Sequence, residues 1–547
     1  MPGGPYRAAH MSPASLLHAC RLSNQLKAAA DLDRRRLLQA VLGVAGMAML
    51  PASVRGQYRN RFTAYPFTLG VASGYPRPDG VSLWTRLAPE PLQPDGGMLR
   101  DEWVTVRWQV ATDEAFGQVV AEGEQRAVGE LGHSVHVDVA GLLPARRYHY
   151  RFIAGDEVSP TGSTLTAPAG GQKTDRLRFA IGSCQHYEQG WFSAYRHMLD
   201  DAPDLVLFLG DYIYESAWGD VRVRRHAGGE PYELGEYRSR HAQYKLDVDL
   251  QRAHGAMPWM VVWDDHEVDN DPAGEQSEHL DPRFLLRRAA AYQAFFEHMP
   301  LPRSMRPDVH GRMRLHTELG YGDLARIFML DTRQYRSPQA CPGDFKGGGS
   351  TRVDPEECAE FGDAARSMLG REQESWLSAR LQAPSPRWNV IAQTTLFAHR
   401  DDQPGAGVKA WTDGWSGYPA ARQRLLADLA QHGGSNPLIV GGDIHATFVA
   451  DVQDDPWAGR PRSLASEVCG TSISSQGAPQ ALTDGVRADN PHVKFARSDR
   501  RGYCLLDVRR NATEVSVRAL DDVTRRDTRI ETLARFNTRI EQPGWES

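Results

Sequence analysis

Short apolar runs between residues 176 and 442 alternate with segments whose apolar residues recur at helical spacing. This alternation is typical of α/β proteins, in which helices cover buried strands. The predicted strands are 176-RLRFAIGS-183, 204-DLVLFLG-210, 258-PWMVVW-263, 324-LARIFML-330, 388-WNVIAQT-394 and 436-NPLIVGG-442. The predicted helices include 283-RFLLRRAAAYQAFFEHM-299 and 420-AARQRLLADLAQH-432. We therefore expect an α/β domain over residues 176–547, ending in a β-hairpin at 502–520 and a last helix in the tail after Arg525.

Residues 61–168 have a different pattern, in which apolar and polar residues partly alternate in short runs. These runs are 80-GVSLWTRL-87, 103-WVTVRWQVA-111, 133-HSVHVDVAGL-142 and 147-RYHYRFIAG-155, and Gly, Pro and Asp separate them. Such runs predict strands joined by short turns, so we expect a small β-sandwich ahead of the α/β domain. The composition of residues 159–175 predicts a linker between the two.

The N-terminal region has the pattern of an export signal. Arg34 and Arg35 precede an apolar run at 40–50, which is too short to span a bilayer, and Pro51-Ala52-Ser53 follows. The pair resembles a twin-arginine signal, which implies the twin-arginine translocase as a partner and a periplasmic or secreted protein. We expect residues 1–56 to be an N-terminal extension and signal, cleaved near residues 52–57. The alternative is a basic patch before a buried helix.

Charge and cysteine content narrow the possible functions. The formal net charge of −6 predicts no basic surface for nucleic acid. Cys20 would leave with the signal, so the remaining cysteines are odd in number for an oxidising compartment. Cys341 and Cys358 flank a glycine-rich loop and are candidates for a disulfide, whereas Cys184 is the candidate free thiol. No feature predicts an oligomer, and a monomer is expected.

Several predicted strands end on polar side chains that a buried strand does not need. The carboxyl ends of strands in an open α/β sheet lie along one edge, where ligands bind. We therefore expect one cleft to collect Cys184, Asp211, Tyr214, Asp265, His266, Asn270, Asp443 and His445. Taken singly, each has an ordinary explanation, since an Asp at a strand end is often a helix N-cap and a buried Cys is often a small apolar residue.

Capping does not explain so many acids at neighbouring strand ends. Carboxylates repel one another, and their burial without cations is costly, so the set predicts a metal cluster. Oxygen donors suit calcium or magnesium, and imidazole suits zinc, iron or copper. A phenolate and a thiolate in one site favour a redox-capable ion of high charge, and ferric iron is the expected one.

The motifs GSCQ, GDYIYE, WDDHEVDND, LDTRQYR, DGWSGYPAAR, GGDIHA and NPHVKF together resemble the PhoD-like alkaline phosphatases. That family belongs to the calcineurin-like metallophosphoesterases, and the resemblance spans nearly the whole mature chain. It implies a core of two facing mixed sheets flanked by helices, preceded by a small β-sandwich. It also implies iron(III) with calcium beside it.

The resemblance assigns roles to individual residues. Cys184, Asp211, Tyr214 and His445 match iron ligands; Asp211, Asn270 and Asp443 match calcium ligands, with Asp211 as the bridge. The chain departs from the wider metallophosphatase pattern where Asp-x-His is replaced by Ser183-Cys184-Gln185 and Asn-His-Glu reads Asp265-His266-Glu267. Asp265 therefore stays a candidate metal ligand, ranked below Asn270.

The expected reaction is hydrolysis of a phosphate ester, with water activated by the metals attacking phosphorus in line with the leaving group. His266 is expected to donate a proton or bind a phosphoryl oxygen, and Arg333 offers a planar fork for phosphate oxygens. The alternatives are that His266 only orients a carboxylate and that Arg333 is paired with a neighbouring acid.

Two other functions fit the chain in part. The same metals serve monoesters and diesters, so a phosphodiesterase, including one that cleaves phospholipid head groups, is the nearest alternative. An exported adhesin with structural calcium is a distant one, because structural calcium sites use carboxylate and carbonyl oxygens rather than Cys184 or Tyr214.

Overall fold

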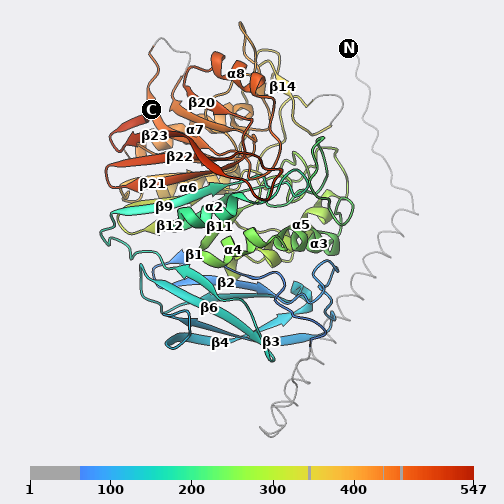
Figure 1. Cartoon of the computed structure of the whole chain (residues 1–547). Helices are drawn as coiled ribbons and strands as arrows, with labels where there is room; N and C mark the ends of the chain where they lie inside the picture. Colours follow the sequence, from blue (N-terminus) through green and yellow to red (C-terminus); the bar gives the residue numbers. More distant parts are fainter. Residues whose placement is uncertain (1–61, 343–346, 435, 456–459, 547) are drawn as a thin grey trace, which may run out of the picture. The chain divides into compact units, whose positions relative to one another are not determined.

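The computed structural model describes residues 62–342, 347–434, 436–455 and 460–546, so the predicted signal lies outside the described residues. The described chain is a mixed α/β protein with several sheets (Figure 1). The largest sheet contains, in spatial order, β24 (Gln542–Glu546), β23 (Ile530–Arg539), β22 (Ala512–Leu520), β21 (Gly502–Arg509), β9 (Arg176–Gly182), β10 (Leu205–Leu209), β11 (Pro258–Val262), β1 (Val71–Arg77), β2 (Gly80–Arg86) and β5 (Ser134–Val139).

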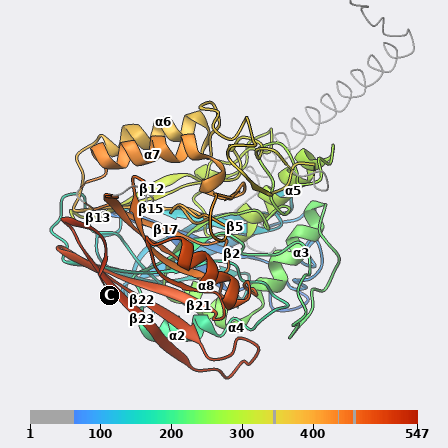
Figure 2. The same cartoon turned by 90° about the horizontal axis from the view of Figure 1, so that it is seen from above.

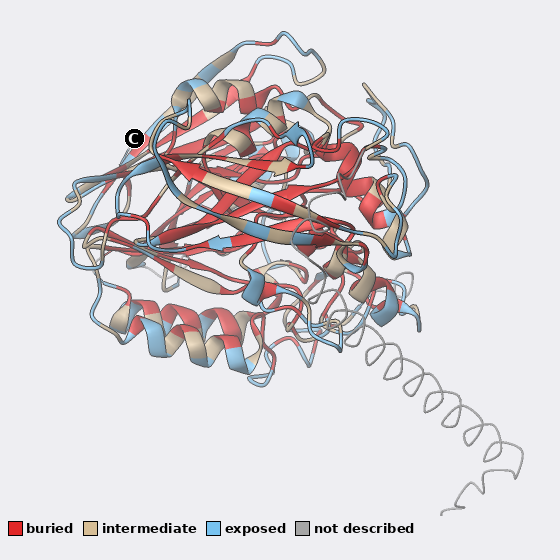
Figure 3. Cartoon of the chain, turned by 90° about the horizontal axis from the view of Figure 1, so that it is seen from below, coloured by how far each residue is buried: buried red, intermediate tan, exposed pale blue. Residues whose placement is uncertain are grey.

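A seven-stranded sheet packs against this ten-stranded sheet. Its order is β12 (Thr317–Tyr321), β13 (Ala325–Met329), β15 (Trp388–Ala392), β17 (Leu438–Gly441), β19 (Ser463–Cys469), β18 (Thr447–Gln453) and β20 (Val493–Arg497). One hydrophobic cluster joins the two sheets and includes Phe179 and Leu207 from one and Val390 and Val440 from the other. The burial of the strands is visible in Figure 3. The two sheets therefore share a core.

Helices cover the outer faces of the sheets. A separate cluster joins α6 (Gly370–Leu381) and α7 (Pro419–His432) to the seven-stranded sheet, where both helices are seen in Figure 2. The other helices are α2 (Ala194–Asp201), α3 (Leu234–Lys245), α4 (Val248–Ala256), α5 (Phe284–His298) and α8 (Gln480–Asp489). None of the helices in the described part of the chain combines the length and apolar character needed to cross a membrane.

The strands of residues 61–168 are divided between two sheets. β3 (Trp103–Ala111), β4 (Val119–Val128), β6 (Arg147–Ala154), β7 (Glu157–Val158) and β8 (Gly162–Leu165) form a five-stranded sheet. That sheet packs on β1, β2 and β5 through a cluster of its own. β1 in turn pairs in parallel with β11. The ten-stranded sheet therefore contains strands from both predicted domains. Gly74 allows this junction, because a Cβ there would lie 2.5 Å from the carbonyl oxygen of Trp259.

Most predicted elements are confirmed, and two predictions are wrong. The six strands predicted from the apolar runs occur as β9, β10, β11, β13, β15 and β17, and the predicted hairpin is β21–β22. The tail forms strands β23 and β24 rather than a helix, because β23 pairs with the free edge of β22. The linker contains β8, which pairs with β6. In both cases backbone pairing with a distant strand decides the conformation.

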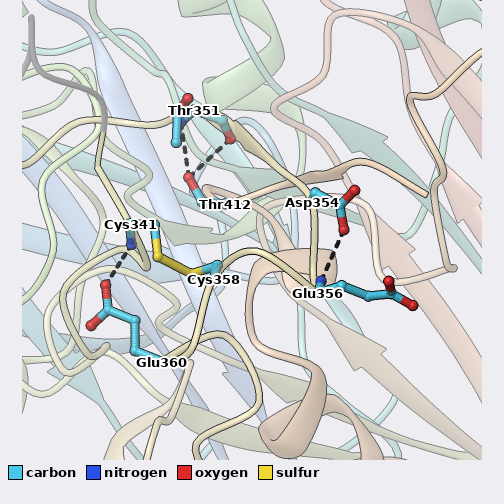
Figure 4. Close-up of a disulfide and its surroundings, with 7 residues drawn as sticks. All are labelled: Cys341, Thr351, Asp354, Glu356, Cys358, Glu360 and Thr412. Atoms are coloured by element: carbon cyan, nitrogen blue, oxygen red, sulfur yellow. Dashed lines mark hydrogen bonds between the residues drawn. A yellow bond between two sulfur atoms is a disulfide. The ribbon is translucent and has the colours of Figure 1, made fainter. Parts of the chain in front are cut away.

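The predicted cysteine pair is confirmed. Cys341 and Cys358 form a disulfide that closes the loop between them, with Glu360 accepting a hydrogen bond from the Cys341 backbone N–H (Figure 4). Cys184, Cys469 and Cys504 are free and buried. Cys184 is thus available as a ligand, as the sequence predicts.

Candidate metal centre

The carboxyl ends of parallel strands from both sheets bring the predicted ligands together. β9, β10 and β11 are parallel neighbours in one sheet, and β15 and β17 are parallel neighbours in the other. Cys184, Asp211, Asp264 and Asp443 each lie two residues beyond the last residue of β9, β10, β11 and β17, respectively. The chain thus turns towards the shared edge at the same position after each strand.

The backbone is strained at four residues in three of these turns. The φ angles are 57° at Cys184, 57° at Asp211, 66° at Asp443 and 51° at His445, all in the left-handed region. Non-glycine residues rarely adopt this conformation, which costs about 1–3 kcal/mol each and clusters at functional sites. The strain falls on four of the predicted metal ligands, which indicates that side-chain placement outweighs backbone preference here.

The side chains form three overlapping groups. These are Cys184 with Asp211 and His445, Asp211 with Asp265 and His266, and Asp264 with Asp265 and Asp443. Within each group the candidate ligand atoms lie within 4.8 Å of one another. Asp211 is common to the first two groups and Asp265 to the last two, so the whole set is continuous.

Tyr214 lies inside the first group and is fully buried. Its hydroxyl is 2.9 Å from Asp211 Oδ2 and 2.9 Å from His445 Nε2, and it accepts a hydrogen bond of 2.9 Å from the Ser475 hydroxyl. A tyrosine that served only to pack the core would not need three polar partners. The phenol oxygen therefore has the position of a ligand shared with Asp211 and His445.

The chemistry of these side chains fits a metal centre. Asp211 Oδ1 and Asp264 Oδ2 are buried and have no hydrogen-bond partner among the described residues. Burial, followed by repulsion from neighbouring carboxylates, raises the pKa of Asp211 and of Asp443 well above the ordinary value. Burial and the charge of Asp211 do the same to the pKa of Cys184 and Tyr214. Bound cations would reverse these shifts and favour the anionic donors.

His266 lies against this cluster and is held by an acid that the sequence analysis did not select. Its Nδ1 is 2.7 Å from Glu215 Oε2, and its ring lies 4.2 Å from the Tyr214 ring, centroid to centroid. Burial lowers the pKa of His266, but Glu215, Asp265 and Asp211 together raise it well above the ordinary value. The contact with Glu215 leaves Nε2 as the nitrogen available to a substrate.

Arg333 is paired with acids, as in the alternative interpretation. Its Nε donates to Asp264, and its Nη1 donates to both carboxylate oxygens of Asp413 at 2.9 Å. Its Nη2 lies 3.6 Å from Asp265 and 3.8 Å from Asp443. The guanidinium therefore neutralises part of the acid cluster, and its role in binding phosphate stays a prediction.

Asn270 is the predicted ligand that the structure does not join directly to these groups. Its side-chain amide donates to Glu278 Oε2 at 3.0 Å. The next residue, Asp271, donates its backbone N–H to Asp265 Oδ2 at 3.0 Å. Asn270 thus lies in a loop attached to the cluster, and its role as a calcium ligand stays a prediction.

Glu267 fixes two of the ligand loops and was missed by the sequence analysis. Its fully buried carboxylate accepts backbone N–H groups from Asp211 at 3.1 Å, Tyr212 at 2.5 Å and Asp264 at 2.8 Å. Burial is the main cause that raises the pKa of Glu267 to about 8. The available signal was its place in the acidic run after β11, directly beside His266.

Trp218 was also missed, and no local pattern marks it. Its indole is stacked on the His445 ring, with centroids 5.6 Å apart and an interplanar angle of 4°. Because the two residues are far apart in the chain, only the fold reveals that Trp218 covers a candidate ligand.

Comparison with known proteins shows the family of the chain. The family model of the PhoD-like phosphatase matches residues 179–517, and that of the PhoD-like phosphatase N-terminal domain matches residues 52–168. Alkaline phosphatase D of Bacillus subtilis (strain 168) is 40% identical over 529 residues, which cover 94% of this chain and 88% of that protein. A solved structure described as the structure of PhoD matches with a TM-score of 0.84 and 41% identity, over 89% of this chain and 92% of that one. The predicted resemblance is confirmed: the chain belongs to the PhoD-like phosphatase family and is a phosphoric ester hydrolase.

Proposed function

We propose that this enzyme hydrolyses phosphate monoesters and diesters with iron(III) and calcium at the candidate metal centre. The observation that carries the proposal is the Tyr214 hydroxyl, which lies between Asp211 and His445 in a group that also contains Cys184. Cys184, Asp211, Tyr214 and His445 would hold iron, and Asp211, Asn270 and Asp443 would hold calcium. Bound there, the cations would screen the phosphoryl charge and make water a better nucleophile.

The chain's own residues supply the rest of the reaction. His266 would give a proton to the leaving oxygen from Nε2, while the contact between Nδ1 and Glu215 keeps the ring in one orientation. Arg333 keeps Asp264 and Asp413 paired and so limits repulsion among the acids. We also propose that the two packed sheets correspond to the calcineurin-like core and that residues 61–168 form the preceding β-sandwich.

Metal content and substrate range test this proposal together. The purified enzyme should contain iron and calcium, and it should cleave both nitrophenyl phosphate and bis-nitrophenyl phosphate. A calcium-selective chelator should abolish both activities, and added calcium should restore them. Full activity in prolonged excess chelator would exclude calcium as a catalytic partner.

The rates on the two nitrophenyl substrates and the metal content also distinguish the two alternative functions, the phosphodiesterase and the adhesin. Cleavage of the diester alone would favour the phosphodiesterase, for which a phospholipid head group is a candidate substrate. Calcium without iron, and no activity on either ester, would favour the adhesin. The placement of Cys184 and Tyr214 beside Asp211 supports the enzyme over the adhesin.

Export through the twin-arginine route remains a proposal, motivated by Arg34 and Arg35 ahead of the apolar run. Replacing both with lysine should hold active enzyme in the cytoplasm, because the translocase reads the arginine pair rather than the charge. Fractionation followed by an activity assay measures this. Normal levels of the double variant in the periplasm would contradict the assignment.

A further inference from the structure

A cavity of about 410 Å³ lies beside the candidate metal centre and takes no part in holding the proposed metals. One wall is α8, which contributes Ala481, Leu482 and Val486. Ile444, Phe448 and residues 400–404 also line the cavity. This volume is in the range of sites that bind small organic molecules.

The cavity adjoins the space beside the metal centre, because two residues line both. A smaller space is lined by Asp443 together with Thr395, whose hydroxyl donates to Asp443 Oδ2 at 2.7 Å. Arg400 and Ile444 line both this space and the larger cavity. A leaving group that extended from a phosphoryl group at Asp443 past Arg400 and Ile444 would reach the cavity beside α8.

The walls are held in place before any ligand binds. At the C-terminal end of α8, the Asn490 side chain accepts from the Asp401 N–H at 2.9 Å and donates to the Asp401 carbonyl at 3.0 Å. Near the other end, Gln480 accepts from the Ser498 N–H at 2.8 Å, and the Thr483 hydroxyl donates to the Ser498 hydroxyl at 2.6 Å. A preformed cavity binds without the entropy cost of ordering its walls.

The chemistry of the lining favours an uncharged, apolar occupant. Three of the charged lining residues are engaged with one another, since Arg352 and Arg400 both pair with Asp402, at 3.1 and 2.7 Å. Asp401 Oδ1 accepts the backbone N–H groups of Gln403 and Lys409. The surface left for a ligand comes mainly from alanine, leucine, isoleucine, valine and phenylalanine side chains.

We infer that this cavity is a leaving-group subsite that selects esters of apolar alcohols, such as alkyl or aryl phosphates, over esters of polyols. The inference rests on the proposed phosphoesterase function and adds a substrate class to it. Leu482 and Val486 would be specificity-determining residues, because they present apolar surface to the leaving group while lying outside the metal ligands. Leu482 is 64% exposed, so a polar side chain there does not disturb the core.

The test compares hexyl phosphate with glycerol phosphate as substrates of the metal-loaded enzyme. We expect kcat/KM to be at least about tenfold higher for hexyl phosphate, since each methylene placed in an apolar pocket is worth that order of discrimination. Leu482→Asp and Val486→Asp should each lower kcat/KM for hexyl phosphate about tenfold, chiefly through KM, and leave glycerol phosphate unchanged. Leu286→Asp, at a 75% exposed position of α5, is the matched control and should change neither value.

The outcomes separate this inference from the proposed function. Equal kcat/KM on both esters in the wild type, or an equal loss on both in Leu482→Asp with circular dichroism unchanged, would overturn the subsite and leave the phosphoesterase intact. No hydrolysis of either ester would overturn the proposed function and the subsite with it.

Discussion

Replacing Tyr214 with phenylalanine should release iron, remove the visible absorption of the enzyme and lower turnover by more than about a hundredfold, with the fold intact. The reason is the position of the hydroxyl, 2.9 Å from both Asp211 Oδ2 and His445 Nε2. A phenolate or thiolate bound to iron(III) transfers electron density to the metal when it absorbs light, so the wild type should be coloured. Metal analysis, the visible spectrum and circular dichroism measure the three effects.

Tyr212→Phe is the matched control for this variant. Tyr212 lies in the same loop and is equally buried, but its hydroxyl contacts His254 Nε2 at 2.8 Å. Losing that hydrogen bond should cost about 0.5–1.5 kcal/mol of stability and leave the metals in place. If Tyr214→Phe behaves like Tyr212→Phe, with unchanged spectrum and rate, Tyr214 is a packing residue and the proposed iron site is wrong.

Glu267→Ala should weaken metal binding and destabilise the fold by about 2–5 kcal/mol. The alanine would leave three buried N–H groups, those of Asp211, Tyr212 and Asp264, without their acceptor. Because Asp211 and Asp264 are in the metal cluster, the loops that position them should loosen together. Thermal unfolding gives the stability, and metal content after dialysis gives the retention.

Glu467→Ala is the control for Glu267→Ala. It distinguishes the effect of losing a buried carboxylate from the effect of loosening the ligand loops. Glu467 is also fully buried and accepts the N–H groups of Phe397 and Ala398 at 2.7 and 2.6 Å. The Glu467→Ala enzyme should lose a similar amount of stability but retain more metal than the Glu267→Ala enzyme. A folded Glu267→Ala enzyme with full metal content and normal turnover would show that Glu267 does not position the site.

Local sequence pattern was enough to predict the central strands and the helices α5 and α7. Their apolar periodicity reflects burial on the faces of a sheet or along one side of a helix, and burial is the property that the pattern records. It failed for β8, a short Gly-Ser-Thr-Leu segment in which buried and half-buried residues alternate, and for β23, most of whose residues are half-exposed or exposed. The conformation of both comes from pairing with β6 and β22, and a pairing partner leaves little trace in a strand's own sequence.

The sequence alone determined which residues follow the buried strands, and so the chemistry of the candidate site. Cys184, Asp211, Tyr214, Asp443 and His445 were all selected in this way, because polar donors at strand ends have no packing role to explain them. Only the tertiary structure decided how these donors are held. The pairing of Arg333 with Asp264 and Asp413, the support of two loops by Glu267 and the cover of His445 by Trp218 join segments far apart in the chain. Such contacts depend on which strands pair and on how the two sheets pack, as when Glu267 after β11 supports the loop after β10, and neither is encoded in the apolar periodicity of a single segment.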